Sequence, residues 1–219
     1  MGATSSSWSA SEAGKDPIAG AVEWDRASKG GNATLLENGW VEITGAGTVL
    51  SSEGITEGSA SWEFEVALTG RGSWIGVVPI GPQSGQNGQN GEGGAKGLGV
   101  DLDKSLGAIG WAIWGGETGA IHPMYIRGAQ SDQTLGFRAG LRPGLTLTVT
   151  SGAAATAASG AAGDTGPGSG GGGTLDYSID GEAVCCAFEE LPVLEEGGAW
   201  RLAASNGWAG TTRVRARRV

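Results

Sequence analysis

The feature that most constrains the fold is an alternation of apolar and polar residues in two segments, 62–68 and 174–181. In each segment every second side chain is apolar, namely Trp62, Phe64, Val66 and Leu68 in the first and Leu175, Tyr177 and Ile179 in the second. Successive side chains of a strand point to opposite faces, so both segments are predicted to be strands with one buried face. The pair Asp180 and Gly181 suits a two-residue hairpin turn.

The rest of the chain also favours short strands, because its apolar runs are brief and end at turn residues, and no window shows helical periodicity. The polar alternation of the strand around Leu145 indicates a sheet with one buried face. The segment that contains His122 and Pro123 is predicted to be a loop. We therefore expect an all-β chain folded as an antiparallel two-sheet β-sandwich, with strands near residues 35–36, 40–44, 48–51, 61–68, 73–79, 98–102, 109–114, 135–137 and 145–149.

A single domain is expected from residue 21 to residue 219, preceded by a flexible tail over residues 1–20. Two low-complexity blocks, at about 81–97 and 151–173, contain too little apolar area to pack and are interpreted as loop insertions. The second block resembles an interdomain linker, but only 46 residues follow it (219 − 173), too few for a comfortable core.

Charge and cysteine content narrow the function classes. The net charge of −9 disfavours nucleic acid and anionic lipid as partners. Arginines at positions 213, 215, 217 and 218 are interpreted as the solvent face of a last strand, with a docking stripe for an acidic partner as the alternative. The two cysteines are neighbours, so the chain is not a disulfide scaffold.

No signal peptide or long apolar run is found, so we expect a soluble, cytoplasmic protein. The start of the chain fits the permissive pattern for myristoylation of Gly2, and an unmodified tail is the simpler reading. With no polybasic cluster after it, such a group would bind membranes only weakly and reversibly, without stable membrane insertion.

From about residue 20 to the end, the sequence resembles the SPRY family. The matching segments are 24–25, 54–58, the strand at 62–66, the glycine-containing strand 74–78, the hairpin at 175–181, the family-specific segment 187–192, the tryptophan-bearing 200–208 and the last strand 212–217. The Leu-Asp-Pro tripeptide of the longer family variant is missing, so the resemblance is to the plain SPRY core. The resemblance implies a concanavalin-like sandwich that binds peptides through loops at one end. It also implies two contexts, substrate selection in ubiquitin ligases and scaffolding.

Catalysis is not expected. Glu63 and Glu65, with Asp176 as a third carboxylate nearby, are candidates for a glycoside hydrolase pair, since such enzymes use paired carboxylates. Both glutamates fall on the strand face opposite Phe64, where solvated charges are the default. His122 is the only histidine, so a histidine-based metal cluster is excluded, and no phosphate-binding loop is found. No metal or cofactor is therefore predicted.

Tryptophans are the better functional lead. Trp24, Trp62 and Trp74 are predicted to be core residues, whereas Trp208 lies in a turn-rich segment where a large ring is hard to bury. The resemblance places such a tryptophan loop at the peptide-binding surface. We expect a non-catalytic module that binds a protein or peptide, with Asn206, Gly207, Trp208, Trp114 and Tyr125 as contacts. A carbohydrate-binding module on the same sandwich, and a structural domain whose acidic surface meets a basic neighbour, remain alternatives.

Overall fold

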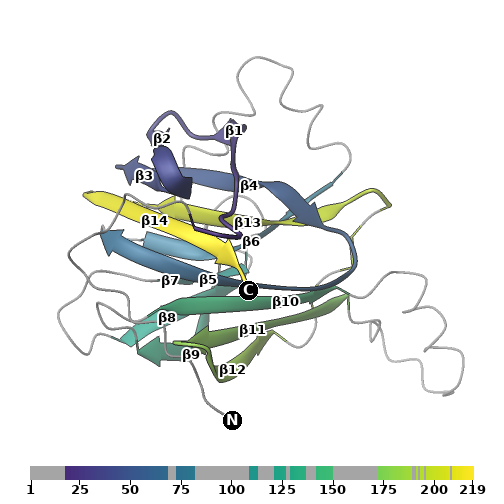
Figure 1. Cartoon of the computed structure of the whole chain (residues 1–219). Coiled ribbons are helices and arrows are strands. Elements are labelled where there is room, and N and C mark those ends of the chain that lie inside the picture. Colours follow the sequence, from purple (N-terminus) through teal and green to yellow (C-terminus); the bar gives the residue numbers. More distant parts are fainter. Residues whose placement is uncertain are drawn as a thin grey trace, which may run out of the picture.

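The computed structural model shows a β-sandwich (Figure 1). The residues that it describes are 18–68, 73–81, 109–112, 121–126, 129–136, 142–149, 172–188, 191, 193–194, 196–207 and 209–219. The strands are β1 (Trp24–Lys29), β2 (Ala33–Leu35), β3 (Val41–Thr44), β4 (Gly47–Ile55), β5 (Gly58–Leu68), β6 (Ser73–Ile80), β7 (Ile109–Ala112), β8 (Ile121–Ile126), β9 (Ala129–Gly136), β10 (Pro143–Val149), β11 (Gly173–Ile179), β12 (Glu182–Phe188), β13 (Ala199–Asn206) and β14 (Thr211–Arg218). One short 3-10 helix, η1 (Glu37–Gly39), joins β2 to β3.

The strands form two seven-stranded sheets, in the orders β1-β4-β13-β6-β7-β8-β9 and β12-β11-β10-β5-β14-β3-β2. Every pairing between the described strands is antiparallel. Figure 1 shows β12, β11, β10, β5 and β14 side by side as one layer. The all-β sandwich predicted from the alternation is confirmed.

The core lies between the sheets and is filled by the alternate side chains that the sequence identified. Phe64 and Leu175 are fully buried, and Tyr177 is 1% exposed. Trp24 and Trp74 are buried as predicted. Each such side chain contributes on the order of 2 kcal/mol through removal from water, so this inner layer supplies most of the driving force for folding.

The predicted hairpin turn is confirmed. Asp180 and Gly181 both have positive φ, 51° and 82°, as a two-residue turn that follows the strand twist requires. Leu145, on β10, lies directly opposite Tyr177 of β11, so the second alternating segment is placed beside the first through β10.

Some sequence predictions were wrong in detail. His122 lies in a strand, β8, and not in a loop. Pro123 is tolerated there because β7 pairs only with residues 124–126, and the register with β9 shifts just after Pro123. Gly173, assigned to the second insertion, begins β11. Most of the second low-complexity block and residues 82–97 of the first block lie outside the described residues. The strand expected at 98–102 and residues 1–17 of the tail, which include Gly2, lie outside them as well.

The first described residues lie beside the last strand. The backbone N–H of Val22 donates to the Ala216 carbonyl at 2.9 Å, and the N–H of Arg218 donates to the Gly20 carbonyl at 2.8 Å. The partner strand β3 reaches only to Val214 of β14. Residues 20–22 therefore satisfy the backbone groups that β3 leaves unpaired.

Candidate functional site

One end of the sandwich is formed by turns that are far apart in the sequence. The β3–β4 turn contains Gly45, and the β13–β14 connection contains Gly210. Their φ angles are +74° and +96°, a region that favours glycine. The N–H of Gly45 donates to the Gly210 carbonyl at 3.0 Å, so the two turns are joined directly.

Asn206 supports both turns from beneath. Its side chain is completely buried, and Nδ2 donates to the carbonyls of Gly45 at 3.1 Å and Gly210 at 3.0 Å. Its Oδ1 has no hydrogen-bond partner among the described residues. A buried amide with two backbone acceptors restricts the turns to one arrangement, because any other would leave its N–H groups without acceptors.

Further polar contacts fix the same end. The hydroxyls of Ser73 and Thr212 lie 2.6 Å apart in a buried position and join β6 to β14. Asn32 donates from its side-chain amide to the Ala46 carbonyl at 2.7 Å. The backbone at this end of the sandwich is therefore pre-organised, which is what a binding surface needs if little entropy is to be lost on association.

The predicted contacts are only partly placed by the structure. Asn206 ends β13, but its buried side chain orders the turns and offers nothing to a partner's surface, which corrects the expected direct contact. Gly207 is half-buried beside it. Trp208 and Trp114 lie outside the described residues, so their role as contacts stays a prediction.

Tyr125 is not beside Asn206. The strand register aligns Tyr125 of β8, through β7 and β6, with Ala203 of β13. Tyr125 is therefore three strands away from β13, and Ala203 is three residues before Asn206. Strand spacing of about 4.8 Å and a rise of about 3.3 Å per residue put the two Cα atoms about 17 Å apart. One compact partner segment that contacts both would have to lie across several strands.

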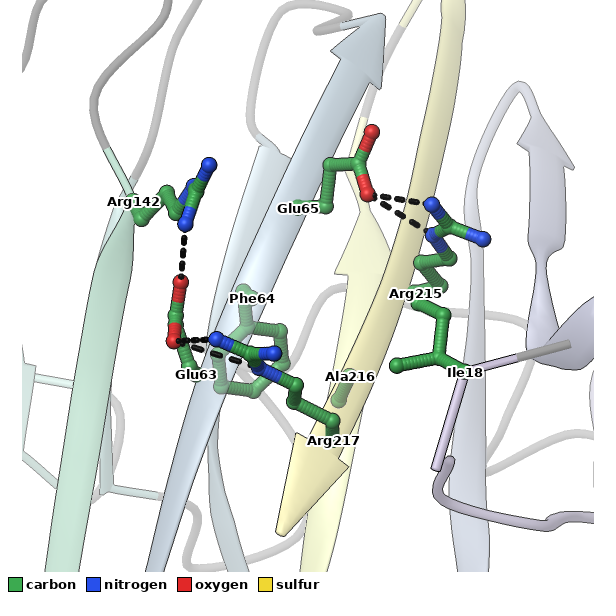
Figure 2. A pocket seen from close by; sticks show the side chains of 8 residues that line it. All are labelled: Ile18, Glu63, Phe64, Glu65, Arg142, Arg215, Ala216 and Arg217. Carbon is green, nitrogen blue, oxygen red and sulfur yellow. Dashed lines mark hydrogen bonds and ion pairs between the residues drawn. The ribbon is translucent and has the colours of Figure 1, made fainter. Parts of the chain in front are cut away.

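Charged residues form a ladder on the outer face of β5 and β14 (Figure 2). Glu63 pairs with Arg217 at 2.6 Å and with Arg142 at 3.2 Å, and Glu65 pairs with Arg215 at 2.6 Å. Glu63 lies directly opposite Arg217 in the register, and Glu65 directly opposite Arg215. The cavity among these residues is about 10 Å³, enough for a water but not for a ligand.

The ladder corrects the interpretation of the arginines as a solvated strand face. Arg215 is 4% exposed, and its guanidinium lies 4.7 Å from the centroid of the buried Trp40 ring. Arg213 pairs with Glu42 of β3. These three arginines of β14 are each held by a glutamate, so they do not form a free basic docking stripe. The matching two-residue spacing of the arginines and of Glu63 and Glu65 is the sequence signal that could have revealed the ladder.

An ion pair also stabilises the other sheet. Arg201 of β13 reaches across β4 to Asp25 at 2.9 Å and to the Ser28 hydroxyl at 3.0 Å. Burial by itself raises the pKa of the Asp25 carboxyl, but the hydrogen bonds from Ser28, Arg201 and the Ala27 N–H outweigh it, and the pKa lies below its usual value. The carboxylate is thus ionised and attached to β13 at neutral pH.

Among the residues that the structure describes, no group of three acidic, histidine or cysteine side chains is arranged to hold a metal ion. Within the same residues, no helix has the length and apolar character to cross a membrane.

Comparisons with known proteins identify the fold. No family model matches the sequence, and no curated protein matches it. Among solved structures, the SPRY domain of human HERC1 superposes with a TM-score of 0.57 at 15% identity, covering 89% of this chain and 96% of that one. The TRIM65 PSpry domain gives 0.54 at 13% identity, covering 89% and 88%. The carbohydrate recognition domain of Emp46p gives 0.49 at 12% identity, covering 90% and 88%. The chain has the two-sheet sandwich fold of SPRY domains and concanavalin-like proteins.

Proposed function

We propose that this domain is a non-catalytic module that binds a segment of a partner protein through the loops at the Asn206 end of the sandwich. The observation that carries the proposal is the pre-organised pair of turns at Gly45 and Gly210, held by a buried amide. Rigid loops on a stable sandwich can bind an extended segment with little loss of conformational entropy. Trp208, two residues after Asn206, supplies an aromatic anchor of the kind that dominates such interfaces.

The paired state of the glutamates supports a role without chemistry. A general acid or nucleophile needs a carboxylate that faces a substrate, whereas Glu63 is engaged by two arginines and Glu65 by one. The cavity that they line has no room for a sugar ring.

The test is a comparison of wild type with Trp208→Ala in an affinity pull-down, followed by quantitative binding of the recovered partner peptide. Loss of an aromatic anchor is expected to weaken binding by at least tenfold while the melting temperature changes little. Leu36→Ala is the control, because Leu36 is an exposed apolar side chain near η1. If Trp208→Ala folds and retains every partner at full affinity, the proposed anchor is wrong.

Carbohydrate binding is the second candidate, favoured by a hydroxyl-rich outer face on β5 and β10. Ser61 and Thr146 lie 2.9 Å apart there, and Ser59 and Thr148 lie 3.2 Å apart. Hydroxyls at strand spacing suit sugar hydroxyls. Both pairs lie near the start of β5, at the end of the sandwich away from Asn206. Specific binding on a glycan array that is lost with Ser61→Ala and Thr146→Ala would favour this candidate over peptide recognition.

Ubiquitin ligation and scaffolding are both compatible with a peptide-binding module. The choice between them depends on the identity of the partner, which the pull-down supplies. Residence in the cytoplasm belongs to the same proposal.

A further inference from the structure

A second cavity lies at the end of the sandwich opposite Asn206. It has a volume of about 290 Å³, close to the lower end of the range for small-ligand pockets. It is lined by Gly20, Ala21, Val22, Glu23, Ser51, Glu53, Ile55, Trp62 and Arg218. Ile55 pairs with Trp200 at the start of β13, whereas Asn206 ends that strand. The six-residue separation puts the two ends about 20 Å apart.

The walls of this cavity come from three separate parts of the chain. Residues 20–23 form one wall, the end of β4 forms another, and Trp62 with Arg218 closes the third side. A backbone hydrogen bond joins the first two walls: the N–H of Ser52 donates to the Glu23 carbonyl at 2.7 Å. The Ser51 hydroxyl donates to the Glu53 carbonyl at 2.6 Å. The cavity is thus part of the folded framework.

The cavity is lined by apolar side chains and by two carboxylates that have no ion-pair partner in the described part of the chain. Val22, Ile55 and Trp62, a core residue that is 7% exposed, are the apolar part. The carboxylates of Glu23 and Glu53 are exposed, and neither makes an ion pair with any described residue. This contrasts with the ladder on β5 and β14, where each glutamate is paired. Arg218 offsets only one of the two charges, so the lining keeps a net negative charge.

We propose that this cavity binds an arginine side chain of a partner peptide. A guanidinium is planar, stacks on aromatic rings and bridges carboxylates, and its aliphatic stem packs on apolar surface. Trp62, the pair Glu23 and Glu53, and Ile55 offer these three features together. Arg218 donates hydrogen bonds to a carbonyl of the peptide. The net charge of −9 attracts such a basic segment at a distance.

The test is an NMR titration of the full chain with the peptide acetyl-Gly-Arg-Gly-amide and with its citrulline counterpart, which is neutral and of the same shape. Arginine peptide is expected to shift the backbone amides of Ala21 and Ile55 and the indole N–H of Trp62, and citrulline peptide is expected to bind far less. Each exposed carboxylate contact is worth roughly a two- to fivefold gain in affinity, so Glu23→Gln with Glu53→Gln weakens binding about 4- to 25-fold.

A matched control removes the same charge elsewhere. Glu37 and Glu57 are exposed and do not line the cavity, so Glu37→Gln with Glu57→Gln keeps the affinity within about twofold. Equal weakening in both double variants, equal binding of the citrulline peptide, or shifts confined to the Asn206 end would each overturn the proposal. Trp208→Ala leaves this binding unchanged, which separates the cavity from the loop-end surface.

Discussion

Replacing Asn206 by aspartate tests whether its amide holds the loop end together. The change preserves size and shape but removes both N–H donors, and it places an acceptor against the carbonyls of Gly45 and Gly210. Because the site is completely buried, no water can replace the lost donors. The shape-preserving substitution is therefore expected to be more harmful than truncation.

The magnitude follows from the contacts. Asn206→Ala loses two hydrogen bonds of about 1 kcal/mol each, and the Gly45 carbonyl loses its side-chain donor, so the expected cost is about 2–3 kcal/mol. The Gly210 carbonyl still accepts from the Gly45 N–H, which limits the loss. With Asn206→Asp, the carboxyl must stay protonated in the fold at pH 7, about three pH units above its ordinary pKa. That adds about 4 kcal/mol, partly offset by a hydrogen bond from the acid O–H.

Urea unfolding at several pH values measures both effects. The folded-state pKa of the introduced acid is raised, so its penalty is present above the unfolded pKa of about 4 and disappears below it. The stability gap between Asn206→Asp and wild type should therefore narrow as the pH is lowered from 7 toward 4, whereas the gap for Asn206→Ala stays constant. Asn32→Asp is the control, because Asn32 makes an equivalent bond to a turn carbonyl while exposed, and its expected cost is below about 1 kcal/mol. A pH-independent gap, or equal costs at both positions, would refute the role assigned to the buried amide.

Three further measurements test the framework. Arg215→Met should lower the free energy of unfolding in urea by about 2–3 kcal/mol, because Glu65 loses its partner and is only partly exposed. Arg213→Met, at an exposed pair, should lower it by less than about 1 kcal/mol. Similar losses in the two variants would show that burial of the ladder is unimportant. The pKa of Asp25 is lowered in the folded state, so its contribution to stability is present above the unfolded pKa, near 3.8, and is lost as the pH falls through the folded pKa. Asp25→Asn should therefore make stability fall less steeply at acid pH. An unchanged acid dependence would contradict this. Phe64→Ala should cost about 3–5 kcal/mol by thermal or urea unfolding, and a cost below 1 kcal/mol would place the core elsewhere.

The sequence was most informative where local pattern alone determines structure. Alternation in β5 and β11 identified their buried faces, and the Asp180–Gly181 pair identified the turn, because both signals depend only on neighbouring residues. The strand β8 was missed because Pro123 opposes strand formation locally, and only the end of the β7 pairing makes it acceptable.

Side-chain roles at the candidate site were harder to predict, because they depend on contacts between distant segments. Asn206 reaches Gly45 across 161 positions of sequence, and nothing near Asn206 distinguishes a buried amide from an exposed loop residue. Tyr125 was predicted to contact the same partner as Asn206, whereas its distance from Asn206 depends on the order of four strands.

The arginine-rich end of the chain shows how pairing changes the meaning of a charge pattern. In sequence, Arg213, Arg215, Arg217 and Arg218 form a basic stripe within an acidic protein. In the fold, each of the first three pairs with a glutamate on a neighbouring strand. The negative charge of the glutamates largely cancels the positive charge that these arginines would present to a partner. Of these four arginines, only Arg218 makes no ion pair with a described side chain, and it lines the second cavity. The glutamates of the ladder are all paired with arginines, so among the described residues the unpaired carboxylates near β14 are Glu23 and Glu53 at this cavity. Their negative charge favours a basic segment as the partner.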